Sequence, residues 1–158
     1  MNFGDPIVFF LTWVTYGTWL PGDDRAWVEY QHGWQLPCRD LEADCETRMN
    51  EGAVRFTKDQ RRRVEEQIAE TCEHRGWQLH AVNCRSNHVH AVVSSKQTPP
   101  KKIRTDLKAY ATRCLKSLDA SRDNWWAERG SIRLILTEDD LDTVITYVND
   151  AQDRKPDA

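Results

Sequence analysis

The apolar positions of the chain recur first with the period of a strand and then with that of a helix. Residues 7–16 (IVFFLTWVTY) are β-branched and aromatic and are apolar at both parities, which predicts a strand buried on both faces. Thr57 and Gln60 match a capping box, which opens a helix that Gly76 ends. The expected buried stripe of this helix consists of Val64, Ile68 and Cys72.

The second half of the chain continues this pattern. Residues 77–84 and 88–95 are expected to form a hairpin, and Pro99-Pro100 opens a second helix that reaches about Leu118. A last strand is expected at 131–138, and the apolar stripe after it predicts a C-terminal helix. The order β-α-β-β-α-β with a terminal helix predicts an α+β fold, a ferredoxin-like (RRM-like) split βαβ sandwich with helices on an antiparallel sheet.

Residues 17–56 interrupt this pattern, because their periodicity is weak apart from a short helix expected near 40–49. Connections of this length in compact domains are commonly functional or disordered. Four of the seven tryptophans (Trp13, Trp19, Trp27 and Trp34) fall in or beside the connection, which argues against disorder. We therefore expect one domain, 1–158, with a long Trp-rich insertion at about 17–56.

Composition excludes several classes of protein. No stretch approaches the roughly 18 consecutive apolar residues of a membrane helix, and the N-terminal residues lack the basic region and cleavage site of a secretory signal. The five cysteines form no C-x-x-C pair, so we expect reduced thiols rather than a disulfide framework or a zinc knuckle. These features predict a soluble, cytoplasmic protein with no membrane partner.

Charge is unevenly distributed, although the net charge is only −3. Residues 96–116 carry seven basic side chains and one acid, whereas residues 138–158 carry seven acids and two bases. Such segregation favours contact with a polyanion at the first segment and disfavours it at the second. Two solvated helix faces are the alternative explanation.

Two histidines lie in the second strand of the expected hairpin. His88 and His90 alternate with apolar residues, so they are expected together on the face opposite the core, with Cβ atoms on the order of 6–7 Å apart. That spacing allows two imidazoles to chelate one metal ion. A three-residue turn between the strands would place Cys84 and Val82 opposite the two histidines, with His80 one step further along the same face.

Tyr110 lies at the edge of the apolar stripe of the second helix and inside the basic segment. The commoner role of such a tyrosine is a boundary position with its hydroxyl in water. A hydroxyl among lysines and arginines is nevertheless placed where a phosphodiester is attracted. Together with a metal-holding histidine pair and tryptophans that stack on bases, it predicts cleavage of single-stranded nucleic acid.

Five stretches of the sequence resemble one known family. SNHVHAVV (86–93) resembles the HUH motif of the single-tyrosine, insertion-sequence-200-like transposases, and DLKAYATRCL (106–115) resembles their tyrosine helix. Three more stretches resemble the branch of REP-associated tyrosine transposases, namely LTWVTYGTWLPGDDRAW, WWAERGSIRLIL and LDTVITYVNDAQ. The stretches occur in the family's order over nearly the whole chain, which makes the resemblance specific.

The resemblance implies an enzyme that binds and cleaves single-stranded hairpin DNA, a repeated palindromic element, and so acts at the nucleoid in DNA transposition. It implies a 5′-phosphotyrosine intermediate, a free 3′-hydroxyl and rejoining of strands. It also implies a divalent metal ion, magnesium or manganese, held by His88 and His90, with Tyr110 as the nucleophile. Monomers and helix-exchanged dimers both occur in the family, so a homodimer is one of two expected states.

DNA contacts are expected from the basic helix and from the tryptophan-rich stretch, where cations meet phosphates and aromatic rings stack on bases. The tryptophans have an alternative role in pinning the long connection to the domain. The expected DNA-binding residues are Lys101, Lys102, Arg104, Lys108, Arg113, Arg25, Trp19 and Trp27.

The third metal ligand stays open. The family often has glutamine or asparagine four residues after the tyrosine, where this chain has Cys114, and a thiolate prefers softer metals than magnesium. Cys114, His80, a water molecule or no ligand at all are the alternatives. If the metal is held weakly, the chain is a catalytically weak or inactive hairpin-binding module. A small-molecule metallohydrolase would need a third strong ligand that the sequence does not show.

Overall fold

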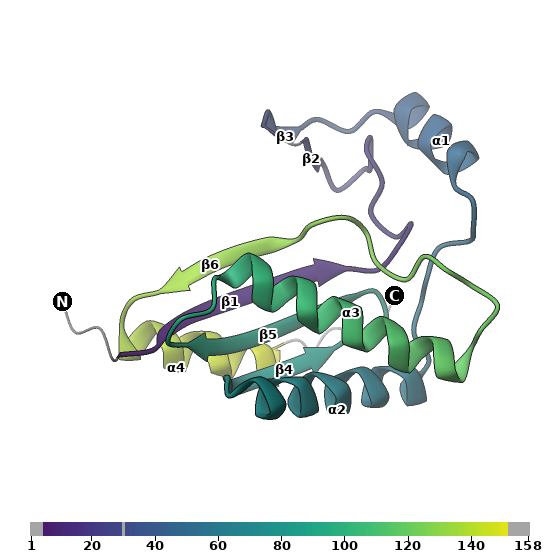
Figure 1. The fold of residues 1–158 in the computed structure, drawn as a ribbon. Helices are drawn as coiled ribbons and strands as arrows, with labels where there is room; N and C mark the ends of the chain where they lie inside the picture. The colour runs from purple at the N-terminus through teal and green to yellow at the C-terminus, as the bar shows by residue number, and fades with distance from the viewer. Residues whose placement is uncertain (1–4, 30, 152–158) are drawn as a thin grey trace.

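A four-stranded antiparallel sheet forms the centre of the molecule (Figure 1). The computed structural model describes residues 5–29 and 31–151. The strand order is β4-β5-β1-β6, in which β1 is Ile7–Val14, β4 is Gln78–Cys84, β5 is His88–Ser95 and β6 is Ser131–Ile135. This order confirms the ferredoxin-like α+β sandwich expected from the sequence.

Helices cover both faces of the sheet (Figure 1). Helices α2 (Lys58–Arg75) and α3 (Pro100–Leu118) pack side by side on one face. Helix α4 (Glu138–Thr146) and the π-helical turn η1 (Tyr147–Ala151) lie on the other. The two faces of the sheet therefore have separate hydrophobic cores.

The ends of the helices follow from local chemistry. Thr57 accepts a hydrogen bond from the backbone of Gln60, whose side chain accepts one from the Thr57 backbone, so the expected capping box is present. Gly76 ends α2 in the left-handed conformation. The last strand is shorter than the expected 131–138, because Thr137 caps α4 through the backbone N–H of Asp140.

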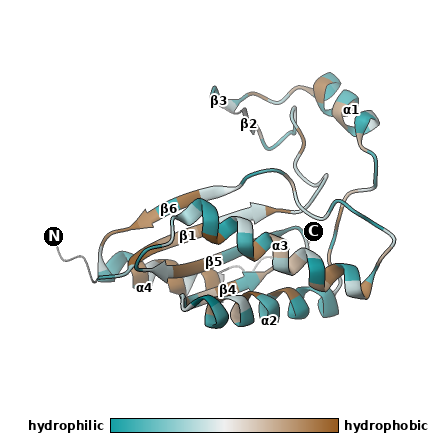
Figure 2. Ribbon diagram, viewed as in Figure 1, coloured by the Kyte–Doolittle hydropathy of each residue, from teal (hydrophilic) through white to brown (hydrophobic). Residues whose placement is uncertain are grey.

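The larger core lies between the sheet and helices α2 and α3. Alternate strand residues point into it, and the helices contribute the stripes expected from their periodicity, so brown and teal alternate along the ribbons of α2 and α3 (Figure 2). Its strand residues include Phe9, Leu11, Trp13, Val89, Ala91 and Val93.

The second core lies beneath α4 and η1. Val92 from β5 and Ile135 from β6 pack there against Val144 and Val148, and Phe10 is partly buried beside them. Apolar residues at both parities of β1 and β5 therefore meet a helix on each side. The face that carries the even-numbered residues of β5, including His88 and His90, is covered in part by the C-terminal helix.

Residues 17–56 form a segment beyond the end of β1 (Figure 1). It holds a two-stranded ribbon, β2 (Trp27–Glu29) with β3 (Gly33–Gln35), and helix α1 (Arg39–Arg48), which confirms the helix expected near 40–49. Its returning end is fastened to the hairpin, because the N–H of Phe56 donates to the carbonyl of Ser86.

Candidate active site

The turn that precedes His88 is one residue shorter than the sequence suggested. The N–H of Arg85 donates to the carbonyl of His88 over 2.8 Å, which closes a two-residue turn instead of the expected three. A change of one residue in a turn moves side chains to the other face of the sheet. Asn83 therefore pairs with His90, whereas Cys84 pairs with Val89 and is buried in the larger core. The expected positions of Cys84 and Val82 opposite the histidines were wrong.

The two histidines do lie together on the face opposite the larger core, as their parity predicted. Their ring centroids are 4.8 Å apart and the rings are nearly perpendicular, at 75°. His90 is 8% exposed. Burial, and secondarily the charge of His88, lowers the pKa of His90 to about 3. The His90 imidazole is therefore neutral at pH 7, which is the state that binds a metal ion.

Each imidazole has an oxygen partner at Nδ1. The Nδ1 of His88 lies 2.8 Å from Asn87 Oδ1, and the Nδ1 of His90 lies 2.7 Å from Thr12 Oγ1. Thr12 is the cross-strand partner of His90 in β1. Partners of this kind fix the orientation of metal-binding imidazoles in proteins.

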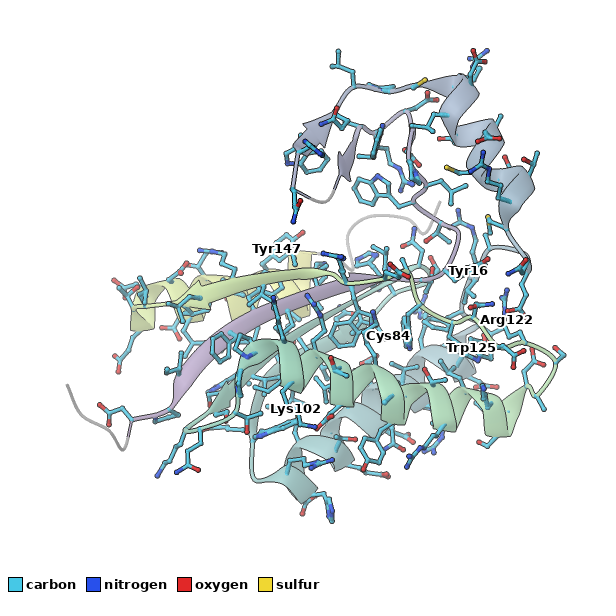
Figure 3. All side chains as sticks on the ribbon, turned by 45° about the horizontal axis from the view of Figure 1, so that its top comes forward. Tyr16, Cys84, Lys102, Arg122, Trp125 and Tyr147 are labelled. Carbon is cyan, nitrogen blue, oxygen red and sulfur yellow. The ribbon has the colours of Figure 1, made fainter. Side chains whose placement is uncertain are left out.

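A tyrosine from the C-terminal helix completes this group. The ring of Tyr147 lies 5.8 Å from that of His90 and 6.3 Å from that of Phe10, between centroids, and the side chain is 44% exposed (Figure 3). The phenol side chain of Tyr147 therefore lies on the histidine face. Sequence reasoning did not place Tyr147 beside the histidines, although it lies in LDTVITYVNDAQ, one of the stretches that resemble the family.

Tyr110 lies on the other side of the sheet. Its helix, α3, packs Ile103, Leu107 and Ala111 into the larger core, which is the face opposite the histidines. The Tyr110 hydroxyl accepts a hydrogen bond from Arg75 over 3.4 Å, and the guanidinium of Arg113 is 4.9 Å from its ring centroid. Within the chain, the sheet separates Tyr110 from the histidine pair, so the expected grouping of these three side chains is not found.

The candidate third ligands do not reach the pair either. Cys114 is buried on α3, where its Sγ accepts a hydrogen bond from Arg63 over 3.2 Å. His80 shares the histidine face, but its Nε2 lies 2.9 Å from Ser94 Oγ, four residues along β5 from His90. Among the described residues, no group of three or more His, Cys, Asp or Glu side chains could hold a metal ion. His88 and His90 by themselves offer a metal ion two nitrogen ligands.

Most of the basic residues of α3 are engaged within the chain. Lys108 donates to the carbonyls of Ala127 and Arg129, and burial lowers its pKa to about 8. Arg104 donates to the carbonyl of Gly130, and Lys102 forms an ion pair with the buried Asp106. These three side chains therefore stabilise contacts within the protein, whereas Lys101 and Arg113 are exposed on the helix.

The predicted DNA-binding residues of the 17–56 segment also have internal partners. Arg25 pairs with Asp23 and its guanidinium lies 4.4 Å from the Trp19 ring centroid. The indole N–H groups of Trp19 and Trp27 donate to backbone carbonyls. Trp34, which was not among the predicted contacts, is the most exposed tryptophan of the described residues, at 67%, and its ring centroid lies 6.5 Å from that of Trp19.

The molecule is thus a ferredoxin-like α+β protein with a His-His-Tyr group on the sheet face beneath its C-terminal helix. The family model "Transposase IS200 like" matches residues 47–151, which is more than half of the chain, so the chain belongs to this family of transposases. Such enzymes process DNA and generally use a divalent metal ion. The match begins after β1 and most of the 17–56 segment.

Two solved structures share the fold. A candidate transposase from Deinococcus radiodurans R1 is 13% identical, with a TM-score of 0.51 over 91% of this chain and 89% of that one. A REP-associated tyrosine transposase bound to a REP hairpin is 12% identical, with a TM-score of 0.52 over 93% of this chain and 68% of that one. No curated protein matches the sequence. No helix in the described part of the chain is long and apolar enough to cross a membrane.

Proposed function

We propose that the chain is a single-tyrosine HUH transposase in which Tyr147, rather than Tyr110, is the nucleophile. The observation that carries this proposal is the position of Tyr147, exposed on the histidine face with its ring 5.8 Å from that of His90. A nucleophile must be accessible to a DNA strand and close to the groups that stabilise the phosphate. Tyr147 meets both conditions, and the sheet separates Tyr110 from them.

The proposed reaction is a transesterification at a phosphodiester of single-stranded DNA. The tyrosine oxygen attacks phosphorus and forms a P–O bond, while the bond from phosphorus to the 3′-oxygen breaks. The tyrosine proton is matched by the proton that the leaving 3′-oxygen takes up, so the products are a 5′-phosphotyrosine and a free 3′-hydroxyl. Attack by a 3′-hydroxyl on the phosphotyrosine reverses these steps and rejoins strands. The reaction needs no nucleotide cofactor.

His88 and His90 are the residues that would hold the divalent ion. They fit such an ion because they are adjacent and have oxygen partners at Nδ1, and because His90 is neutral. Bound there, a divalent ion would polarise a phosphate oxygen. Of the two metals considered from the sequence, manganese accepts imidazole nitrogen more readily than magnesium, which prefers oxygen ligands. We therefore propose manganese as the better activator.

The proposed partner is a single-stranded DNA hairpin, such as a repeated palindromic element of the nucleoid. One protein of the same fold is bound to a REP hairpin. Lys101 and Arg113 are exposed and available for phosphates, and Trp34 beside Trp19 offers an aromatic surface for an unpaired base. We also propose that the chain is one catalytic domain in which residues 17–56 are an insertion.

A denaturing gel tests this function. Labelled single-stranded hairpins from the DNA flanking the gene are incubated with the protein in Mn²⁺, in Mg²⁺ and in EDTA. We expect a protein-linked DNA band that requires metal, persists in Tyr110→Phe and disappears in Tyr147→Phe. A band that disappears in Tyr110→Phe and persists in Tyr147→Phe would contradict the assignment of the nucleophile.

A binding module is the second candidate function. It is favoured by the finding that, among the described residues, only two nitrogen donors are grouped at the site. Such a module would bind hairpins equally well in EDTA and would give no covalent band in any metal. A gel shift run beside the cleavage assay separates the two functions.

A further inference from the structure

A pocket of about 390 Å³ lies within the 17–56 segment, at the end that joins β1. Thr18 lines it where the chain enters the segment, Glu42 and Met49 line it along α1, and Arg55 lines it where the chain returns. Its volume falls in the range of about 300–1,000 Å³ that is usual for sites of small ligands. The pocket is therefore large enough for a ligand of modest size.

Hydrogen bonds to neighbouring parts of the chain hold the returning wall of the pocket. Tyr16, labelled in Figure 3, accepts at its hydroxyl from the N–H of Asn50 over 3.2 Å and at its carbonyl from the N–H of Val54 over 2.8 Å. The carboxylate of Glu51 accepts from the N–H and from the side-chain amide of Asn124, each over 2.7 Å. This wall is therefore part of the folded structure before any ligand binds.

The charges of the pocket disfavour a phosphate and favour a ligand that donates hydrogen bonds. Asp23 forms an ion pair with Arg25, and Glu51 is engaged with Asn124. Among the acids of the pocket, the carboxylates that remain for a ligand are those of Glu42 and Glu46, one turn apart on the same side of α1. The charged residues of the lining are four acids and two arginines, namely Asp23, Glu42, Glu46, Glu51, Arg25 and Arg55.

The pocket lies close to the histidine turn. Val14, at the end of β1, is the cross-strand partner of His88. Gly17, which lines the pocket, follows three residues later, so the Cα atoms of Val14 and Gly17 are within about 11 Å of each other. Between them, the N–H of Thr15 donates to the carbonyl of Asn87, the residue before His88. A DNA strand with a phosphate at the histidines therefore has a nearby nucleotide within reach of the pocket.

An aromatic surface borders the pocket. The guanidinium of Arg25, a lining residue, lies 4.4 Å from the ring centroid of Trp19, and the exposed ring of Trp34 lies 6.5 Å from that of Trp19. Indole rings stack on unpaired bases whatever their sequence. The pocket and the indoles together therefore suit a single strand, with stacking at the tryptophans and recognition of a base edge in the pocket.

We propose that the pocket binds one unpaired guanine of single-stranded DNA and that Glu42 reads its Watson–Crick edge. Guanine has two adjacent N–H donors, at N1 and N2, which match the two oxygens of one carboxylate, and the other three bases have no such pair. Its O6 and N7 accept hydrogen bonds, which suits an arginine such as Arg55. The inference rests on the proposed function for single-stranded DNA as the partner, and it adds the base and the site that reads it.

Met49 offers a direct probe of the pocket, because it is one of only two methionines in the chain. Protein labelled with ¹³C at its methionine methyl groups is titrated in EDTA with d(TTTGTTT), d(TTTITTT) and d(TTTTTTT), and Met49→Leu assigns the signal. Inosine (I) differs from guanosine only by the loss of the N2 amino group. We expect the guanine oligonucleotide to shift the Met49 signal with an affinity about 10-fold or more above that of the other two.

Glu42→Gln tests the carboxylate, since glutamine keeps the shape of the side chain but replaces one acceptor oxygen with a donor. We expect the preference for guanine over inosine to fall to within about twofold in this variant. Asp44→Asn is the matched control, because it makes the same change of charge on the other side of α1, where Asp44 pairs with Arg48. It should keep the full preference.

Equal affinity for guanine and inosine in the wild type, or a Met49 signal that responds to none of the oligonucleotides, would overturn the proposal. So would a Glu42→Gln protein that keeps the full preference for guanine. Failure of the proposed function is a separate result, because the wild type would then give no covalent DNA band while its Met49 signal still distinguished guanine from inosine.

Discussion

Asn83 connects the histidine strand to the tyrosine helix. It is the cross-strand partner of His90, and its side-chain amide donates a hydrogen bond over 2.9 Å to the backbone carbonyl of Val148, the residue after Tyr147. The side chain is buried, at 9% exposure. One pair of strands thus positions both halves of the His-Tyr group, through backbone pairing for His90 and through Asn83 for Tyr147.

Substitution Asn83→Leu tests this connection. Leucine is similar in volume but cannot donate, so the buried carbonyl of Val148 loses its partner at a cost of about 1–3 kcal/mol. We expect a lower free energy of unfolding in urea and a larger relative loss of covalent DNA product, because Tyr147 is no longer held against His90. Asn124→Ala, which removes a side-chain hydrogen bond to Glu51 in a distant loop, serves as the control. If Asn83→Leu matched Asn124→Ala in product yield, Asn83 would have no special role at the site.

The sheet and the faces of its strands could be predicted because they depend on local periodicity. Alternation along 88–95 placed the histidines opposite the larger core, and apolar residues at both parities of 7–16 indicated a strand covered on both sides. The same observation could have located the proposed nucleophile. A strand buried on both faces needs a helix on each, and the last helix, with Tyr147 beside its stripe, is the one left for the histidine face.

The misplaced residues depend on features that periodicity does not carry. Tyr110 was predicted from the charges around it and from the resemblance of residues 106–115 to the tyrosine helix of the family, but several of those charges have partners within the fold, as Lys108 and Arg104 show. Cys84 was misplaced because the length of the turn decides the register, and Arg85-Ser86-Asn87 is compatible with a two-residue or a three-residue turn. The placement of Tyr110 depends on contacts between residues that are far apart in the sequence. The placement of Cys84 depends on a shift of one residue in the strand register.

Gly22 should be required for the docking of helix α1. Its φ is +90°, and a Cβ at this position would overlap the carbonyl oxygen of Cys38 and lie 2.6 Å from the nitrogen of Glu42. We expect Gly22→Ala to loosen the 17–56 segment and to speed its cleavage by trypsin, while the sheet keeps its urea midpoint. Gly52→Ala is the control, because a Cβ there meets nothing within 4 Å. Equal proteolysis of the two variants would contradict this account.

Lys108 should make the stability of the protein depend on pH in the alkaline range. Burial, and then the charge of Arg104, lowers its pKa to about 8, partly opposed by Glu128, whereas the unfolded chain has the ordinary value of about 10.4. Between these values the unfolded state binds more protons, so this residue's contribution to the free energy of unfolding rises from pH 8 to pH 10.4 and is constant below pH 8.

Urea unfolding of wild type and Lys108→Met at several pH values isolates this contribution, since the other titrating groups are common to both proteins. We expect the stability of the wild type relative to Lys108→Met to increase as the pH rises from 8 toward 10.4. A difference that stays constant over this range would show that Lys108 is not held in the buried position beside Ala127 and Arg129.

The cysteines should divide into two classes by reactivity. Cys38 is exposed and Cys45 is partly exposed, both in the 17–56 segment, whereas the remaining three are buried. Burial raises the pKa of Cys72 to about 12 and also raises that of Cys84, so neither forms the reactive thiolate near neutral pH. We expect Ellman's reagent at pH 8 to modify Cys38 and Cys45 rapidly and the others only after unfolding in urea. Rapid modification that persists in a Cys38→Ser, Cys45→Ser double variant would show that α2, α3 and the hairpin do not pack as described.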